Sequence, residues 1–163
     1  MFPQHLTQLA EAVLSAARKK GLRIATAESC TGGLIAGCLT EIAGSSDVVD
    51  RGFITYSNDA KVKLVGVQQA TLEKHGAVSA ETALEMAQGA LKNSQAQLAV
   101  SATGIAGPGG ATDTKPVGLV YIGIASGKNA FTIKNLFGGD RAAVRTETVE
   151  TALTALKKEI DAL

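Results

Sequence analysis

Residues 26–34, TAESCTGGL, gather a carboxylate, three hydroxyls, a thiol and two glycines between two apolar segments. Ser29 stands where a strand is expected to end and a helix to begin. Its hydroxyl could therefore project into a cleft as a nucleophile, with helix N–H groups behind it as an oxyanion hole. The same position suits an N-cap serine, which is the commoner role. Position alone leaves both roles of Ser29 open.

Cys30 is intrinsically the stronger nucleophile, but a cysteine mechanism usually recruits a histidine. The chain has only two histidines, His5 and His75, and neither adjoins this segment in the sequence. We therefore expect Cys30 to be a small buried thiol. A general base for Ser29 must be sought among other side chains.

Lys61 is the candidate base, because we expect it in the first turn of a helix that begins near Asn58. The helix dipole opposes a cation there, and partial burial would lower the lysine pKa further, which makes a neutral amine accessible. Lys63 should face elsewhere. The alternative for either lysine is a solvated surface charge. Tyr56, at the end of the preceding strand, could bond Lys61 or a substrate, or serve packing alone.

Two glycine-rich segments follow predicted strands. Gly32 and Gly33 would let a ligand approach the first turn of a helix, or would simply form a tight turn. The segment 104–110, GIAGPGG, has the same ambiguity, although Thr103 at its start favours ligand contact. Neither segment matches a dinucleotide-binding fingerprint or a P-loop. Ligands gather beyond the carboxyl ends of such strands, so we expect these segments to converge with residues 55–61.

The apolar spacing predicts alternating helices and strands that position these groups. Asp140 should cap the last helix and Ser79 an earlier one. The predicted fold is α/β, a single-domain α/β/α sandwich over residues 1–163 with a mixed sheet of about five strands. The expected helices are 6–17, 34–43, a short one from Ser57 or Asn58, one after Ser79 and one after Asp140, and the expected strands are 22–27, 52–57, 97–104, 118–126 and 130–137.

Composition excludes several function classes. Sixteen basic residues balance fifteen acidic ones, which argues against nucleic acid and anionic membranes as partners. No apolar run is long enough to span a membrane, and the N-terminus lacks the pattern of a signal peptide, so we expect a cytoplasmic protein. The two histidines and two cysteines lack metal-ligand spacing, so we expect neither a metal nor another cofactor.

Five separated motifs carry a resemblance that runs over nearly the whole chain. TAESCTGGLIAG, AGSSDVVDRGFITYSNDAK, HGAVS, SATGIAGPGG with KPVG, and GDRAAVR resemble the CinA C-terminal domain family, the bacterial nicotinamide-nucleotide amidohydrolases. The resemblance implies hydrolysis of the carboxamide of nicotinamide mononucleotide to nicotinate mononucleotide and ammonia. It further implies serine/lysine chemistry without a metal.

The resemblance also implies roles for particular residues. It assigns Ser29, Lys61, Tyr56 and Ser46 to catalysis, and either Ser29 or Ser46 as the nucleophile. Arg141 would clamp the nucleotide phosphate, with a surface ion pair as the alternative. The remaining substrate-binding positions would be Thr31, Gly32, Gly33, Ser45, Thr103 and Gly104.

Two alternatives remain beside this reading of the motifs. One is a catalytically silent nucleotide-binding regulatory module linked to competence or DNA damage, although binding alone does not need an activated serine. The other is an amidase for a different small carboxamide. The sequence does not decide whether the chain forms a homo-oligomer.

Overall fold

The computed structural model describes residues 1–163 and contains one five-stranded mixed sheet with the strand order β2-β1-β3-β4-β5. β1 (Ile24–Glu28) pairs in parallel with β2 (Val49–Ile54) on one side and with β3 (Leu98–Gly104) on the other. β4 (Leu119–Ser126) and β5 (Ala130–Leu136) continue the sheet as antiparallel strands. The expected mixed sheet of five strands is therefore confirmed, and β4 and β5 form a hairpin across Gly127 and Lys128.

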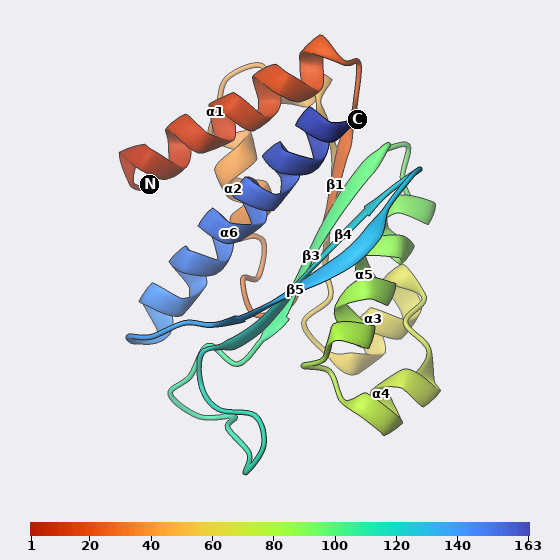
Figure 1. The fold of residues 1–163 in the computed structure, drawn as a ribbon, viewed down its shortest axis with the longest axis vertical. Helices are drawn as coiled ribbons and strands as arrows, with labels where there is room; N and C mark the ends of the chain where they lie inside the picture. The colour runs from red at the N-terminus through yellow and green to blue at the C-terminus, as the bar shows by residue number, and fades with distance from the viewer.

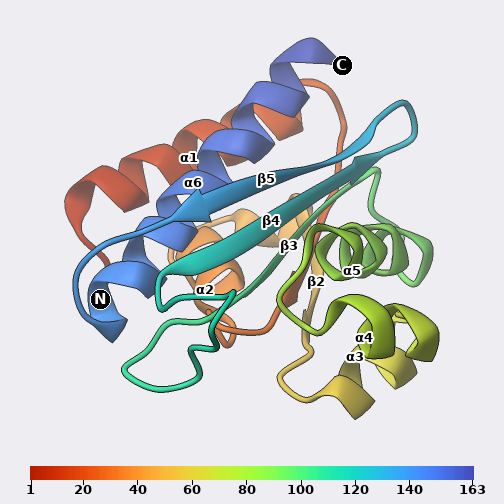
Figure 2. The same ribbon diagram turned by 60° about the horizontal axis from the view of Figure 1, so that its bottom comes forward.

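Helices cover both faces of the sheet, as the α/β/α expectation requires (Figure 1; Figure 2). One face carries α1, α2 and α6, and the other carries α3, α4 and α5. The larger apolar core lies beneath α1, α2 and α6, whereas a smaller one lies beneath α3, α4 and α5. The bounds of these helices are α1 Gln4–Lys19, α2 Leu34–Thr40, α3 Asn58–Val65, α4 Gln69–His75, α5 Ala80–Lys92 and α6 Arg141–Ala162.

Local capping signals place the helix starts correctly. The side chains of Ser57, Ser79 and Asp140 each accept a hydrogen bond from an N–H in the first turn of α3, α5 and α6, respectively. Three expectations were wrong in detail. β2 begins and ends three residues earlier than expected, α2 stops at Thr40 rather than near Gly44, and α4 was not predicted.

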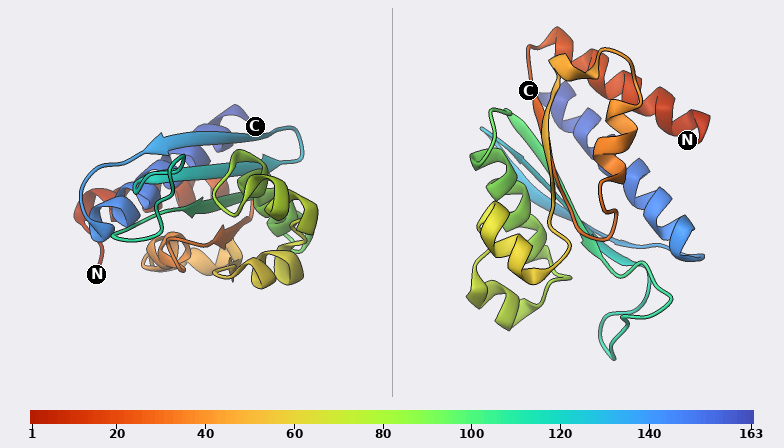
Figure 3. Two further views of the ribbon diagram at one scale, coloured as in Figure 1. Left: turned by 90° about the horizontal axis from the view of Figure 1, so that it is seen from below. Right: turned by 180° about the vertical axis from the view of Figure 1, so that it is seen from behind.

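The carboxyl ends of β1, β2 and β3 meet at one edge of the sheet, because these three strands are mutually parallel. Residues 29–33, 55–57 and 105–118 leave the sheet there, and the last of these segments extends beyond it (Figure 3). The first α6 turn reaches the same edge. None of the helices combines the length and apolar composition that crossing a membrane requires.

Candidate active site

Ser29 and Lys61 meet at the carboxyl end of β1. Lys61 Nζ lies 3.0 Å from Ser29 Oγ, and it also contacts the backbone carbonyls of Thr55 at 2.9 Å and Tyr56 at 3.5 Å. An ammonium has three N–H bonds for these three acceptors. In the neutral amine, two N–H bonds suffice for the carbonyls and the lone pair is left for the Ser29 hydroxyl. The contact therefore suits proton transfer from Ser29 to Lys61.

Lys61 is buried, with only 1% of its surface exposed, and no carboxylate lies within ion-pair distance of it. Burial without an anionic partner lowers the pKa of the Lys61 amine, because desolvation penalises its charged form. Lys61 is also the fourth residue of α3, where the helix dipole disfavours a cation. Both effects favour the neutral amine that a general base requires.

Ser29 does not cap α2, because Glu28 takes that role. The buried Glu28 carboxylate accepts hydrogen bonds from the N–H groups of Gly33 and Ile35 through Oε2, and from that of Ala36 through Oε1. Ser29 Oγ is consequently free to contact Lys61. The N-cap alternative for Ser29 is excluded. Sequence reasoning did not identify Glu28 as the cap of α2. The signal for it was a carboxylate that shortly precedes a Gly-Gly pair at the start of a helix.

The N–H groups that could stabilise an oxyanion differ from those expected. Glu28 occupies those of Gly33, Ile35 and Ala36, so the first turn of α2 is not free to bind an anion. The N–H groups of Cys30 and Thr31 donate to no oxygen or nitrogen acceptor in the protein, and the only acceptor near them is the Cys30 sulfur, which accepts weakly. Because they directly follow the Ser29 hydroxyl in the chain, they are the available donors for an oxyanion.

Gly32 and Gly33 have positive φ angles of 60° and 102°, a backbone conformation that side-chain-bearing residues rarely adopt. The tight turn therefore requires both glycines for their backbone conformation. Space does not limit Gly32, because a Cβ atom there would have only Arg145 as a neighbour, at 3.8 Å.

Cys30 is buried beside the Ser29–Lys61 pair, and this burial raises the pKa of its thiol to about 11. At neutral pH the group is therefore a thiol and not the nucleophilic thiolate. Cys38, also buried, has a pKa raised to about 11 by desolvation. Both cysteines are free, and the expectation of a small buried thiol at Cys30 is confirmed.

Two arginines on one side of α6 reach the three loops of the site. Arg141 donates to Gly107 O at 3.0 Å and to the Tyr56 hydroxyl at 3.4 Å, and it has no carboxylate partner. Arg145 donates to Thr31 O at 3.1 Å, while its buried Nε has no partner. The ion-pair alternative for Arg141 is excluded, and Arg145 is a cation that sequence reasoning did not single out.

Tyr56 does not bond Lys61 through its hydroxyl. Its side chain is 62% exposed and its hydroxyl accepts from Arg141, whereas only its carbonyl contacts Lys61. The tyrosine ring therefore lies at the mouth of the site.

Thr103 and Thr31 also lie at this end of the sheet. The buried Thr103 hydroxyl donates to Ala77 O at 2.7 Å, which ties β3 to the segment before α5. The buried Thr31 hydroxyl has no partner in the protein. A side chain at Gly104 would collide with Val120 on β4, so strand packing alone demands this glycine.

Ser45 and Ser46 lie at the opposite end of the sheet from Ser29. They form part of a short 3-10 helix that precedes β2, and β2 runs parallel to β1. The five residues of β1 separate the two ends by roughly 16 Å. Within one chain, the structure does not bring either serine to Lys61. A helix that connects two neighbouring strands indicates that the strands are parallel. The helix expected between β1 and β2 therefore already indicated that the residues just before β2 lie far from Ser29.

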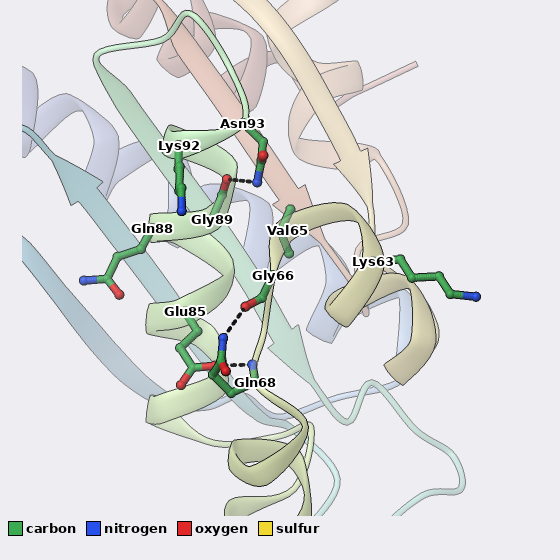
Figure 4. A pocket seen from close by; sticks show the side chains of 9 residues that line it. All are labelled: Lys63, Val65, Gly66, Gln68, Glu85, Gln88, Gly89, Lys92 and Asn93. Carbon is green, nitrogen blue, oxygen red and sulfur yellow. Dashed lines mark hydrogen bonds between the residues drawn. The ribbon is translucent and has the colours of Figure 1, made fainter.

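The largest cavity, about 420 Å³, lies away from the Ser29–Lys61 pair, between α5 and the C-terminal part of α3. Figure 4 shows its polar lining, in which Glu85 accepts from the Gln68 N–H at 2.8 Å. Lys63 lines this cavity and pairs with Asp59, so it faces away from Lys61 as expected. The cavity holds no buried unpaired cation or nucleophile, and the site is therefore assigned from its chemistry rather than its volume.

Comparisons with known proteins give matches over nearly the whole chain. The family model for the CinA C-terminal domain matches residues 6–160. The nicotinamide-nucleotide amidohydrolase PncC of Escherichia coli K12 is 48% identical over 157 residues, which cover 96% of this chain and 95% of the relative. A CinA-like protein of Chloroherpeton thalassium is 50% identical over 149 residues, 89% of this chain.

Some relatives are much longer than this chain. The chain spans 36% of the Chloroherpeton protein and 37% of two proteins from Caldicellulosiruptor species that are 54% identical to it. The crystal structure of the competence/damage inducible protein CihA from Agrobacterium tumefaciens has a TM-score of 0.96 and 50% identity, and the match covers 99% of this chain and 98% of that one. A CinA superfamily protein from Escherichia coli gives a TM-score of 0.91 at 32% identity, over 97% and 94% of the two chains.

Proposed function

The chain belongs to the CinA C-terminal domain family, and from that premise we propose that it hydrolyses the carboxamide of nicotinamide mononucleotide to nicotinate mononucleotide and ammonia. The observation that carries the proposal is the 3.0 Å contact between Ser29 Oγ and a buried Lys61 that has no carboxylate partner. A relative identical at nearly half of its positions over almost its whole length is named a nicotinamide-nucleotide amidohydrolase.

In the proposed first half-reaction, Ser29 Oγ attacks the carboxamide carbon while neutral Lys61 takes the hydroxyl proton. The N–H groups of Cys30 and Thr31 stabilise the resulting oxyanion. The C–N bond then breaks, and the Lys61 ammonium returns the proton to the departing nitrogen, which leaves as ammonia. The product of this half-reaction is an ester between Ser29 and the nicotinoyl group.

In the second half-reaction, Lys61 removes a proton from water, whose oxygen attacks the ester carbon. The ester bond breaks, Ser29 Oγ recovers a proton from Lys61, and the carboxylic acid product leaves. The direct contact between Ser29 and Lys61 makes a relay through a second serine unnecessary. Ser46 has no part in this mechanism within one chain, because it lies at the other end of β1.

The nucleotide phosphate is assigned to the α6 side of the site, where Arg141 presents an unpaired guanidinium next to Tyr56 and Gly107. A guanidinium suits phosphate because it offers several N–H donors in one plane. Arg145 adds a second unpaired positive charge one helical turn further along. The positive charge of the site is thus local, since the chain as a whole is nearly neutral.

We place the protein in the cytoplasm, as two free buried thiols suit a reducing compartment. A silent nucleotide-binding module is less consistent with the site, because binding alone gives no reason to bury a lysine against a serine. An amidase for another small carboxamide would use the same pair, but it would have no use for two unpaired arginines.

The test incubates pure protein with nicotinamide mononucleotide and measures ammonia together with nicotinate mononucleotide. We expect equal amounts of the two products. Lys61→Ala should abolish turnover, while Lys63→Ala, which alters an exposed lysine two residues away, should retain it. Absence of both products, or equal loss in the two lysine variants, would refute the proposal.

A further inference from the structure

We propose that Glu28 is the positioning residue of the nucleophile: its carboxylate holds the turn of residues 29–32 so that the Ser29 hydroxyl and the N–H groups of Cys30 and Thr31 face one another across the reacting carbon. The inference rests on the proposed Ser29–Lys61 mechanism. In this role the buried Glu28 carboxylate takes no proton and contacts no substrate. It nevertheless affects the rate of that reaction.

The Glu28 side chain makes an unusually complete set of hydrogen bonds. Oε2 accepts from the N–H groups of Gly33 and Ile35, both at 3.0 Å, and Oε1 accepts from that of Ala36 at 2.8 Å. The buried Thr26 hydroxyl donates to Oε1 at 3.1 Å. Backbone N–H groups can only donate, so both oxygens must accept, as a carboxylate does and an amide side chain does not.

These contacts close a loop around the nucleophile. The carboxylate binds the first turn of α2, and the backbone of Glu28 is held in β1, so residues 29–32 are fixed at both ends. Within the turn, the Ser29 N–H donates to Ala102 O at 2.9 Å, and Ser29 O accepts from the Gly32 N–H at 3.1 Å. Every backbone group of Ser29 is therefore engaged, and only its hydroxyl is free to react.

Glu28 also connects the nucleophile to its base. The Glu28 carbonyl accepts from the Thr55 N–H at 2.8 Å, and the Thr55 carbonyl accepts from Lys61 Nζ at 2.9 Å. One residue thus sets the position of Ser29 through its side chain and that of Lys61 through its backbone. Small displacements matter here, because a misplacement of about 1 Å can cost about a hundredfold in rate.

Glu28→Gln tests the role of the side chain, because the amide keeps the volume but offers one acceptor oxygen instead of two. We expect kcat for nicotinamide mononucleotide to fall at least about tenfold with KM little changed. The acid limb of the pH profile should not move, since Lys61 remains the titrating base. Glu28→Asp, which retains two acceptor oxygens, should recover part of the rate.

The matched control is Glu159→Gln, which alters another buried carboxylate. Glu159 accepts from the Ser126 hydroxyl at 2.8 Å and from Asn129 Nδ2 at 3.0 Å, at the end of the sheet far from Ser29. The Glu159→Gln variant should be less stable than wild type, with kcat unchanged. A kcat of Glu28→Gln within twofold of that control would overturn the proposal. If Glu28→Gln does not fold, Thr26→Val removes one donor to the carboxylate, and an unchanged kcat in that variant would overturn it equally.

A second readout separates this inference from the substrate assignment. The rate at which phenylmethylsulfonyl fluoride modifies Ser29, followed by intact mass, reports the reactivity of the nucleophile without any nucleotide. Slow modification in Glu28→Gln and fast modification in wild type and Glu159→Gln support the positioning role, even if no ammonia is released from the mononucleotide. Equal modification rates in Glu28→Gln and wild type contradict it, even if ammonia is released. An unreactive Ser29 in wild type refutes both proposals.

Discussion

At the scale of single residues, the site separates two adjacent nucleophiles by their surroundings. Ser29 contacts a buried amine, whereas burial raises the Cys30 pKa to about 11 and holds it as a thiol. Ser29→Ala should therefore lower kcat by several orders of magnitude and leave nucleotide binding largely intact, because the hydroxyl acts in the transition state. Cys30→Ala should cost little. Steady-state ammonia release, with binding measured by calorimetry, decides whether Ser29 or Cys30 is the nucleophile. A Cys30→Ala variant that still binds nucleotide but is inactive would assign the role to Cys30.

The lowered pKa of Lys61 predicts two pH dependences. Below that pKa the amine is protonated and cannot accept the Ser29 proton, so kcat/KM should fall on the acid side. Folding should respond as well, because the unfolded chain binds the lysine proton up to a pKa of about 10.4 while the folded chain has already lost it. Stability attributable to Lys61 therefore rises with pH between its lowered pKa and that value.

Lys61→Met removes this linkage, so its free energy of unfolding should rise less with pH than that of wild type. Urea unfolding of both proteins at neutral and alkaline pH measures the difference, and parallel pH dependences would contradict the lowered pKa.

At the scale of secondary-structure elements, helix caps position the catalytic groups. Ser57 accepts from the Ala60 N–H at 3.1 Å at the start of α3, one turn before Lys61, and Ser79 caps α5 in the same way. Either serine replaced by alanine should cost about 1 kcal/mol of stability. Only Ser57→Ala should also lower kcat, by a few fold, because only α3 carries the base. Equal kcat values in the two variants, at matched stability loss, would show that α3 holds Lys61 without its cap.

The first turn of α6 serves the other end of the substrate. Arg141→Ala should raise KM for nicotinamide mononucleotide more than for nicotinamide riboside, which lacks the phosphate that Arg141 is proposed to hold. Arg18→Ala is the control, because Arg18 pairs with Asp47 at the far end of the sheet. Initial-rate kinetics with both substrates measure the two KM values, and equal increases would remove the phosphate role of Arg141.

At the scale of the whole molecule, no group of three or more histidine, cysteine, aspartate or glutamate residues is placed to hold a metal ion. The proposed mechanism obtains its charge stabilisation from N–H groups and its base from Lys61. Ammonia release should therefore survive exhaustive treatment with EDTA. Loss of activity that a divalent ion restores would replace the serine/lysine mechanism by a metal-assisted one.

What the sequence determined by itself was local. The caps at Ser57, Ser79 and Asp140 could be predicted because each bond joins residues three positions apart. The mixed sheet followed from the spacing of apolar residues and the short turn before β5. The chemical types at the site were likewise visible, because a serine between a strand and a helix and a lysine in a first helical turn are patterns of neighbouring residues.

Only the tertiary structure decided which of these groups meet. Ser29 and Lys61 are 32 residues apart, and their contact exists because β1 and β2 pair in parallel and end at the same edge. That pairing also sends Ser46 to the opposite end of β1, away from Lys61 of the same chain. The cap of α2 fell to Glu28 because a buried carboxylate could reach three N–H groups at once. Such selections depend on distances across the fold, which spacing along the chain does not encode.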